Sequence, residues 1–282
     1  MSKNCKNVVR RMPVQSLWIG DSLSVLEQLC IRSFQENGHE FHLYAYEDIA
    51  QLPADVIVKD ANDIIPKNEI FRVRNSLAIF SDLFRWKLLS NKGGCWVDMD
   101  MICLKPFEFS EEVVFGLQSN DLVATGVLVF PPEHYLAEWI ANNCMHPNQT
   151  LPYDSWGDRI RKFTKKYLLG NQRKHLRWGE AGGPKGLSAI LKHVGMFEFA
   201  KPANFFYPVA APQWKSHFDE TYSEGLNFFN DSYATHLWNE ILSANRFHTE
   251  RGNQEFDKNG PFIKGSFIDQ MIQRYCGSMK VD

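Results

Sequence analysis

The twenty residues from Ser81 to Asp100 constrain this chain more than any other segment. They read SDLFRWKLLSNKGGCWVDMD, in which apolar residues first recur at helical spacing and then meet a Gly-Gly pair. A short apolar strand follows, and Asp98 and Asp100 stand where that strand ends. We therefore expect a helix that turns directly into a buried strand, with two carboxylates at the edge of a sheet.

The helix in front of this strand carries polar residues in a mostly apolar sequence. Ser81, Asp82 and Arg85 share one helix face, because residues three and four apart are neighbours on a helix. A mostly buried helix does not carry an aspartate and an arginine without a reason. A guanidinium suits phosphate oxygens and a carboxylate suits ribose hydroxyls, although an ion pair on a surface helix would give the same pattern.

Asp98 and Asp100 flank a single residue, so both carboxylates could reach one cation if the strand turns there. Hard divalent ions prefer oxygen ligands, and a diphosphate supplies more of them. The Asp-x-Asp tripeptide alone is equally typical of a solvated turn. The polar residues of the preceding helix favour a metal site instead. The segment as a whole predicts a site for a divalent metal and a nucleotide diphosphate.

The rest of the chain alternates between strand and helix patterns, which predicts an α/β fold with a sheet flanked by helices. Helices are expected at 22–37, with a capping box from Ser24 to Glu27, and then at 77–91, 131–145 and 184–193. Strands are expected at 14–19, 40–46, 95–97, 113–117, 125–130 and 232–238.

Composition narrows the class of protein. The 282 residues are 44% hydrophobic and 13% aromatic, enough for one large domain with a sizeable core. A net charge of only −2 implies no polyanionic partner, so we expect no nucleic acid binding.

No segment has the length and apolar character of a membrane span, and the basic N-terminus lacks the apolar stretch of a secretory signal. Scattered cysteines without metal-binding spacing indicate a reducing, cytoplasmic location: Cys5, Cys30, Cys95, Cys103, Cys144 and Cys276.

The run SDLFRWKLLSNKGGCWVDMDMICLKPF resembles the DXD-containing sugar transferases of the GT-A type. The most similar are the α-1,4-galactosyltransferase and α-1,6-mannosyltransferase group, with the glucosylating domains of large clostridial toxins as distant cousins. Their pattern is Ser-Asp, then Arg, Leu, Gly-Gly, an aromatic residue and Asp-x-Asp, and here Cys-Trp replaces the usual aliphatic-Tyr pair. Nine positions match in order and spacing: Ser81, Asp82, Arg85, Leu89, Gly93, Gly94, Trp96, Asp98 and Asp100.

Three shorter matches lie outside this run. Trp18, in LWIG, resembles the family tryptophan that stacks on the nucleotide base, although it could equally be a core aromatic residue. Gly183, in GGP, resembles a Gly-Pro turn in the second half of the family. His236, in HLW, resembles a C-terminal histidine that can bind the metal, since imidazole with two carboxylates is a common divalent ligand set. A structural histidine at a strand end is the alternative. The resemblance spans 14–238, and nothing beyond 239 matches.

The resemblance implies a GT-A fold, a Rossmann-like mixed sheet flanked by helices, in a single catalytic domain over 1–282. Within that domain we expect a nucleotide-sugar-binding half at 14–107 and an acceptor-side half at 108–245. A helical insertion is expected at 148–177, and a C-terminal extension at 246–282.

The resemblance also implies a reaction. A sugar would move from a nucleotide diphosphate sugar, with UDP preferred, to a glycan or glycolipid hydroxyl, with retention of configuration. Bacterial surface polysaccharide or lipopolysaccharide synthesis suits such an enzyme, and a toxin-like effector that glycosylates proteins is the alternative. Asp98, Asp100 and Arg85 would be catalytic. Asp98, Asp100 and His236 would bind Mn²⁺ or Mg²⁺, while Trp18, Ser81, Asp82, Arg85 and Gly183 would bind the donor.

Two other classes of protein remain open. A haloacid dehalogenase-like phosphatase also places Asp-x-Asp after an apolar strand, but normally on the first strand of its domain and without the preceding helix pattern. A non-catalytic nucleotide-sugar-binding module would keep the fold and lose turnover. The intact set of Asp82, Arg85, Asp98 and Asp100 argues against it.

Residues 159–177 contain eight Lys or Arg and no Asp or Glu. Ile160, Phe163 and Tyr167 recur at helical steps, which indicates a basic amphipathic helix. One interpretation is peripheral contact with an anionic membrane or a phosphate-bearing acceptor. The other is a solvated helix face in the expected insertion.

Overall fold

The computed structural model describes residues 12–219, 221–222, 225–239 and 257–277. Cys5 and the N-terminal basic residues therefore lie outside the described residues, as do 246–256 and 278–282 of the expected C-terminal extension. In the described part of the chain, no helix combines the length and the apolar character that crossing a bilayer requires.

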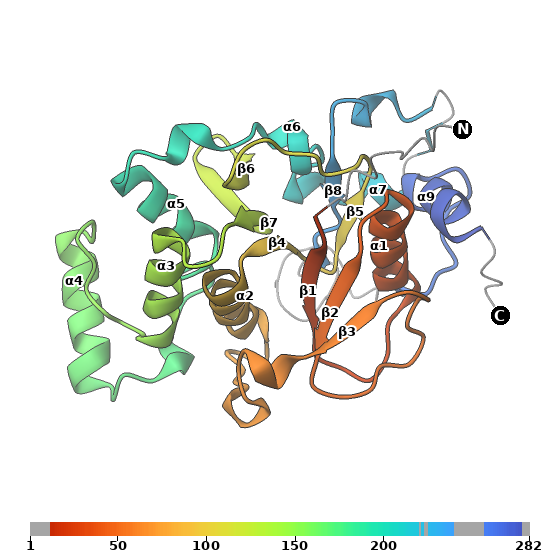
Figure 1. Ribbon diagram of the computed structural model, residues 1–282. Helices are drawn as coiled ribbons and strands as arrows, with labels where there is room; N and C mark the ends of the chain where they lie inside the picture. Colours follow the sequence, from red (N-terminus) through yellow and green to blue (C-terminus); the bar gives the residue numbers. More distant parts are fainter. Residues whose placement is uncertain (1–11, 220, 223–224, 240–256, 278–282) are drawn as a thin grey trace, which may run out of the picture.

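A six-stranded mixed sheet forms the centre of the molecule (Figure 1), in the order β3-β2-β1-β4-β7-β6. The first four strands in that order run parallel, whereas β7 is antiparallel to both of its neighbours. The parallel strands end at one edge, and Asp98 follows the last residue of β4 there. The strands are β1 (Val14–Trp18), β2 (Phe41–Ala45), β3 (Ile57–Asp60), β4 (Gly94–Val97), β6 (Val114–Ser119) and β7 (Leu122–Phe130).

A second, two-stranded sheet joins distant parts of the sequence. β5 (Met101–Cys103) pairs antiparallel with β8 (Ala234–His236), and Met101 lies opposite His236. The pairing continues past the strand, because the Leu237 N–H donates to the Asp100 carbonyl oxygen (2.9 Å). Met101, which follows the Asp-x-Asp motif, thus fixes the position of His236.

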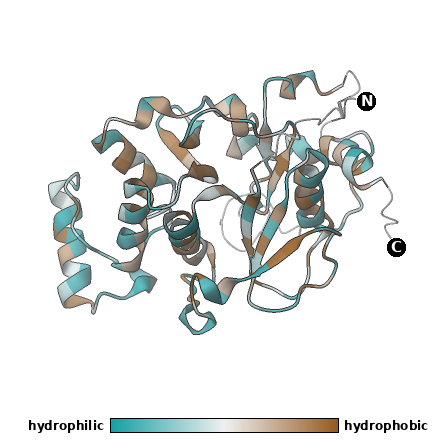
Figure 2. Ribbon diagram, in the orientation of Figure 1, coloured by the Kyte–Doolittle hydropathy of each residue, from teal (hydrophilic) through white to brown (hydrophobic). Residues whose placement is uncertain are grey.

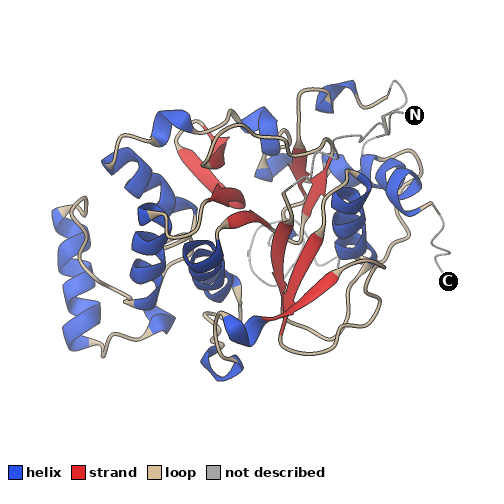
Figure 3. Ribbon diagram, in the orientation of Figure 1, coloured by secondary structure: helices blue, strands red, loops and turns tan. Residues whose placement is uncertain are grey.

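Helices cover both faces of the main sheet (Figure 3). One buried cluster joins the sheet to β5, β8, α1 (Val25–Glu36) and α9 (Phe267–Cys276); the other joins it to α2 (Ala78–Lys92), α3 (Tyr135–Met145) and α5 (Pro184–His193). Alternate residues of β4 serve the two clusters, with Val97 in the first and Trp96 in the second, as the two-residue period of a strand requires. The remaining helices are α4 (Trp156–Phe163), α6 (Ala203–Phe206) and α7 (Ser216–Asp219).

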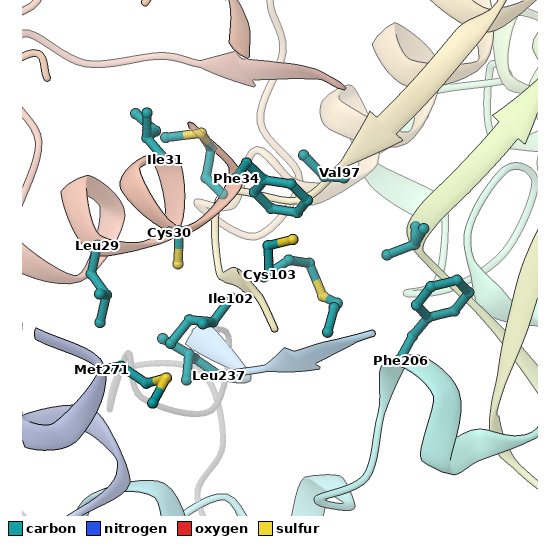
Figure 4. Packing of buried hydrophobic residues seen from close by; sticks show 14 of the residues in the cluster. Leu29, Cys30, Ile31, Phe34, Val97, Ile102, Cys103, Phe206, Leu237 and Met271 are labelled. Atoms are coloured by element: carbon teal, nitrogen blue, oxygen red, sulfur yellow. The ribbon is translucent and has the colours of Figure 1, made fainter. Parts of the chain in front are cut away.

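The first cluster anchors the second sheet (Figure 4). Leu29, Cys30 and Phe34 of α1 lie around Ile102 of β5, with Leu237 and Met271 close by. All of these side chains are buried. A three-residue strand would not persist alone, so this apolar packing holds β5 and the carboxylate that precedes it.

The expected α/β class with a mixed sheet flanked by helices is confirmed. α1 begins at Val25 rather than 22, because Ser24 is its N-cap and donates its N–H to the Glu27 carboxylate (3.0 Å). α3 begins four residues later than expected because His134 caps it, and its ring accepts the Leu136 N–H.

Five of these elements were not predicted from the sequence. β3 is too exposed to show an apolar alternation, β5, α6 and α7 are only three or four residues long, and α9 lies in a stretch without any family resemblance. The expected helical insertion contains α4 and a π-helical turn (Thr164–Leu168). The division into donor and acceptor halves stays a prediction.

Truncation of Phe34 tests the α1 packing. The ring is fully buried and lies against Phe41 and Phe107, with centroids 6.0 and 5.4 Å away. Phe34→Ala should lower the free energy of unfolding in urea by about 3–5 kcal/mol. The exposed Phe199 provides the control, since Phe199→Ala should cost less than about 1 kcal/mol. Equal losses would contradict this account of the core.

Candidate active site

The Asp-x-Asp segment forms a tight turn between the two sheets. The Asp98 N–H donates to the Gly126 carbonyl of β7 (2.9 Å), which continues the β4 ladder by one residue. The Asp98 carbonyl then accepts the Met101 N–H (3.1 Å), which closes the turn. Met99 is buried in the first core cluster. The turn therefore fixes both aspartates, and it satisfies the condition under which they could share a cation.

His236 completes a cluster of possible metal ligands. One ligand atom from each of Asp98, Asp100 and His236 lies within 4.8 Å of the others. His236 Nε2 is 3.0 Å from Asp100 Oδ1, and the Asn239 N–H donates to Asp100 Oδ2 (2.9 Å). His236 Nδ1 is buried and has no hydrogen-bond partner among the described residues. The strand pairing of β5 with β8 thus brings together three residues that the sequence predicted as a set.

Asp100 and His236 titrate as a pair. Burial alone would raise the pKa of Asp100, but the attraction and hydrogen bond of His236 and the Asn239 N–H hold it below its usual value. Burial alone would lower the pKa of His236, whereas the neighbouring Asp100 carboxylate raises it. Asp100 is therefore an anion ready to bind a cation. A cation here would displace the imidazolium proton, since a metal binds neutral imidazole.

Arg85 is the centre of a buried charge network on α2. Its NH1 donates to the Thr125 carbonyl oxygen (2.6 Å) and lies 3.2 Å from Asp98 Oδ1. Its NH2 lies 3.5 Å from Asp82 Oδ1 and 3.4 Å from Ser81 Oγ. The pairing explains how α2 buries a guanidinium, and excludes the alternative of a surface ion pair. In this arrangement Arg85 holds Asp98 and Asp82 in place.

Trp96 forms a second hydrogen bond to the Asp98 carboxylate. Its indole N–H donates to Asp98 Oδ1 (2.8 Å), and the Arg85 guanidinium carbon lies 5.1 Å from its ring centre. The aromatic position of the family pattern thus has a physical role in this chain. It gives Asp98 a second donor where Tyr is the more usual residue.

Burial disfavours the charged form of Asp82. Burial raises the pKa of this carboxyl to about 7, the Arg85 charge opposes the increase, and the Asp98 charge adds to it. A proton on Asp82 therefore exchanges near neutral pH. Its carboxyl can be either a donor or an acceptor toward a hydroxyl group.

Gly183 lies directly beside Asp82, although the two are far apart in sequence. The Trp86 indole N–H donates to the Gly182 carbonyl oxygen (2.6 Å) and draws this turn onto α2. A Cβ at Gly183 would lie 2.9 Å from Asp82 Oδ2, and one at Gly182 would lie 2.4 Å from Cys144 Sγ. The glycines therefore permit a close approach that any side chain would prevent.

Trp18 is placed apart from these groups. It ends β1, at the same sheet edge as Asp98, and its indole N–H donates to the Ser22 carbonyl oxygen (3.0 Å). It is half-buried and packs on the α1 side of the sheet. Among the described residues it makes no hydrogen bond to the carboxylate cluster, so its role toward a nucleotide base stays a prediction.

Sequence patterns missed two supports of the site. The buried Tyr207 hydroxyl accepts the Val127 N–H (3.1 Å), and its ring lies 5.8 Å from that of His236. Burial, followed by the charge of Asp98, raises the pKa of Tyr207 well above its usual value. Asn239 lies just past the end of the resemblance at 238, yet its N–H donates to the Asp100 carboxylate. The uncharged stretch around Tyr207 was the only available signal, and it did not specify a role.

The donor set suits a hard divalent cation. Two carboxylates and an imidazole are typical ligands of Mn²⁺ and Mg²⁺-type sites, and the adjacent Arg85 and Asp82 offer groups for phosphate and hydroxyl recognition. The site can therefore hold a metal–diphosphate complex in chemical terms.

Two family models match the chain at these residues. "Glycosyltransferase sugar-binding region containing DXD motif" matches 25–120, which includes Asp98 and Asp100. "Alpha 1,4-glycosyltransferase conserved region" matches 191–256, which includes His236. Over these two segments the chain is similar to DXD-containing glycosyltransferases and α-1,4-glycosyltransferases. The second match also extends beyond 239, where the sequence resemblance was expected to end, into residues that the structure does not describe.

Curated relatives agree with this assignment. The chain is 28% identical to the Homo sapiens "Alpha-1,4-N-acetylglucosaminyltransferase" over 174 residues, covering 61% of this chain and 46% of that protein. It is 28% identical to the Rattus norvegicus "Lactosylceramide 4-alpha-galactosyltransferase" over 206 residues, covering 71% of this chain and 48% of that protein. The chain thus spans about half the length of the curated relatives it matches.

Among solved structures, "PaToxG Glycosyltransferase" aligns with a TM-score of 0.41 and 12% identity, covering 65% of this chain and 69% of that one. A TM-score below 0.5 is too low to establish a common fold. The likeness therefore adds nothing to the sequence matches.

The buried Asp82 carboxyl predicts a specific pH dependence of the free energy of unfolding of this protein. Its folded-state pKa of about 7 exceeds the ordinary 3.8, so the folded protein retains a proton that the unfolded chain releases. Stability should fall as pH rises from about 4 to 7, by on the order of 1.4 kcal/mol per pH unit at most. Asp82→Asn removes this contribution.

Urea unfolding of both proteins at a series of pH values checks the prediction. The difference between Asp82→Asn and the unmodified protein cancels all other titrations. The free energy of unfolding of Asp82→Asn minus that of the unmodified protein should increase as pH rises from about 4 to 7. A difference that stays constant with pH would show that Asp82 titrates normally.

Proposed function

We propose that this protein is a metal-dependent glycosyltransferase that moves a sugar from a nucleotide diphosphate sugar to an acceptor hydroxyl. The observation that carries the proposal is the cluster of Asp98, Asp100 and His236, located inside two glycosyltransferase sequence matches. Asp98 and Asp100 belong to the turn between β4 and β5, whereas His236 is the last residue of β8, far away in the sequence. A histidine that a distant strand brings to this turn favours a binding role over a solvated turn.

Asp98, Asp100 and His236 would hold Mn²⁺ or Mg²⁺. When bound, such an ion stabilises the negative charge that develops on a departing diphosphate. Arg85 keeps Asp98 oriented for this task through its 3.2 Å contact and its anchor on the Thr125 carbonyl. Its own contact with the diphosphate, expected from the resemblance, is part of the proposal.

Asp82, Ser81 and Gly183 would form the wall beside the donor sugar or ribose. Asp82 offers a carboxyl whose proton exchanges near pH 7, which suits hydrogen bonding to a hydroxyl in either direction. The absence of a side chain at Gly183 allows its backbone to lie against the Asp82 carboxyl. Trp18 would stack on the base from the end of β1.

For donor and acceptor we propose UDP-sugar and a glycan or glycolipid. The support comes from relatives whose names give α-1,4-galactosyl and N-acetylglucosaminyl transfer and, in one case, lactosylceramide. Retention of configuration and a role in bacterial surface polysaccharide or lipopolysaccharide synthesis belong to the same proposal. A protein-glycosylating effector is its alternative, and a cytoplasmic location stays a prediction.

The family matches favour transfer over the phosphatase alternative. The Asp-x-Asp segment follows β4, the fourth strand in the chain, and α2 before it carries the Arg85 network. A phosphatase of the haloacid dehalogenase type has no use for that helix. A thermal-shift screen of nucleotide sugars with Mn²⁺ would identify the donor. A turnover assay with that donor would then distinguish an enzyme from a non-catalytic nucleotide-sugar-binding module.

Removal of the Asp100 carboxylate should abolish transfer. Asp100→Ala deletes a ligand that bonds His236 and the Asn239 N–H. We expect at least about a 100-fold loss of turnover, with circular dichroism and the chromatographic profile unchanged. Asp219→Ala, an exposed carboxylate on α7, serves as the control and should keep full activity. Near-normal turnover of Asp100→Ala with excess metal would refute the assignment.

Metal removal gives a second test. EDTA should stop donor hydrolysis, and added Mn²⁺ or Mg²⁺ should restore it. Calorimetry supplies a readout that does not need turnover, since Mn²⁺ should bind the unmodified protein and bind His236→Ala at least about tenfold more weakly. Activity that persists in EDTA, together with no measurable Mn²⁺ binding, would exclude the metal.

A further inference from the structure

Helix α4 presents an apolar stripe to solvent. Trp156, Ile160, Phe163 and Tyr167 follow one another at steps of four, three and four residues, which places them on one helix face. Their exposed fractions are 77%, 53%, 57% and 63%, and the adjoining Leu168 is 72% exposed. The rings of Phe163 and Tyr167 lie together, with centroids 4.7 Å apart. The stripe continues beyond the end of α4 into the π-helical turn, which contains Tyr167 and Leu168.

Two basic residues of the same helix, Arg161 and Lys162, form ion pairs and are only partly exposed. Arg161 pairs with Glu180 (2.9 Å) and Asp158 (2.8 Å), and its side chain is only 21% exposed. Lys162 pairs with Asp154 (2.7 Å). A surface helix normally buries its apolar face, whereas α4 exposes Trp156, Ile160 and Phe163. The sequence-based idea of a basic helix face turned to solvent is therefore wrong for these two residues.

Apolar exposure of this extent indicates a binding surface. Large contiguous apolar patches are rare on monomeric proteins and mark interaction sites. Here the patch lies on a helix at one edge of the molecule, away from the main sheet (Figure 1), and hydrophobic and hydrophilic residues alternate along its ribbon (Figure 2). The exposed side chains of the stripe are therefore open to a partner at this edge of the molecule.

Charge at the stripe favours an anionic lipid surface over a second copy of the chain. From 155 to 177 the sequence has eight Lys or Arg and a single acid, Asp158. Arg159 and Lys166 are exposed beside the stripe; Arg159 donates to the Pro152 and Asp154 carbonyl oxygens, and Lys166 lies over the Tyr167 ring. Two such surfaces would repel each other, whereas anionic headgroups would attract both.

We propose that α4 docks this protein on an anionic membrane, with the stripe of Trp156, Ile160, Phe163 and Tyr167 inserted at the headgroup boundary. Tryptophan and tyrosine suit that depth because they combine an apolar ring with a polar group, and flanking bases contact lipid phosphates. The docking itself does not depend on transferase activity. Its consequence for the acceptor, that a lipid-borne glycan is within reach, rests on the proposed function.

Vesicle sedimentation of the full chain tests the docking. The protein should bind vesicles of phosphatidylcholine and phosphatidylglycerol in equal parts, and bind phosphatidylcholine alone more weakly. Trp156→Ala combined with Phe163→Ala should lower the partition coefficient at least about tenfold, since two inserted aromatic rings are lost. Phe228→Ala, an exposed aromatic far along the sequence, is the matched control and should bind as the unmodified protein does. Arg159→Gln with Lys166→Gln should reduce binding to the anionic vesicles only.

Three results would overturn the proposal. These are absence of vesicle binding by the unmodified protein, equal binding by the double aromatic variant, and a concentration-dependent dimer in light scattering that the same variant abolishes without any vesicle binding. Both aromatic residues are exposed, so the variant should keep its thermal unfolding midpoint. Donor hydrolysis in the absence of vesicles, measured in parallel, should be unchanged by it. Loss of hydrolysis in Asp100→Ala and loss of vesicle binding here are thus separate results, and each proposal can fail alone.

Discussion

The site depends on the cost of burying charge. Asp82, Arg85, Asp98, Asp100 and His236 all lie at one edge of the sheet, where water cannot fully solvate them. Each has an oppositely charged neighbour, as buried charges require. The three carboxyl groups of Asp82, Asp98 and Asp100 face two basic groups, those of Arg85 and His236. This excess of carboxyl groups favours a further cation, which connects the fold to the proposed chemistry.

The architecture meets this constraint by joining elements from both ends of the chain. α2 brings Arg85 beneath the end of β4, and the packing of α1 against β5 holds the turn that carries Asp100. The pairing of β5 with β8 then adds His236 and the Asn239 N–H. α1 and β8 are far in sequence from the segment that carries Arg85, Asp98 and Asp100. Loss of the apolar packing on the α1 side would therefore disperse the ligands even though no ligand lies in that core.

Local patterns predicted the helix of Arg85, the strand of Trp96 and the turn of Asp98 and Asp100, because helical and strand periodicity within twenty residues determine them. Resemblance supplied His236 and Gly183, and the structure brings His236 to Asp100 and Gly183 to Asp82. Tyr207 and Asn239 could not be predicted, since they act through a hydroxyl and a backbone N–H whose position only the tertiary fold defines. The outward stripe of α4 was equally hidden, because periodicity shows that a helix has two faces but not which face the protein covers.

Anomalous diffraction from a crystal soaked with Mn²⁺ and UDP tests the central claim most directly. The account predicts a manganese peak in contact with carboxylate oxygens of Asp98 and Asp100 and a ring nitrogen of His236, with diphosphate oxygens completing the coordination. A crystal with nucleotide bound elsewhere, or with no manganese between these three residues, would contradict it.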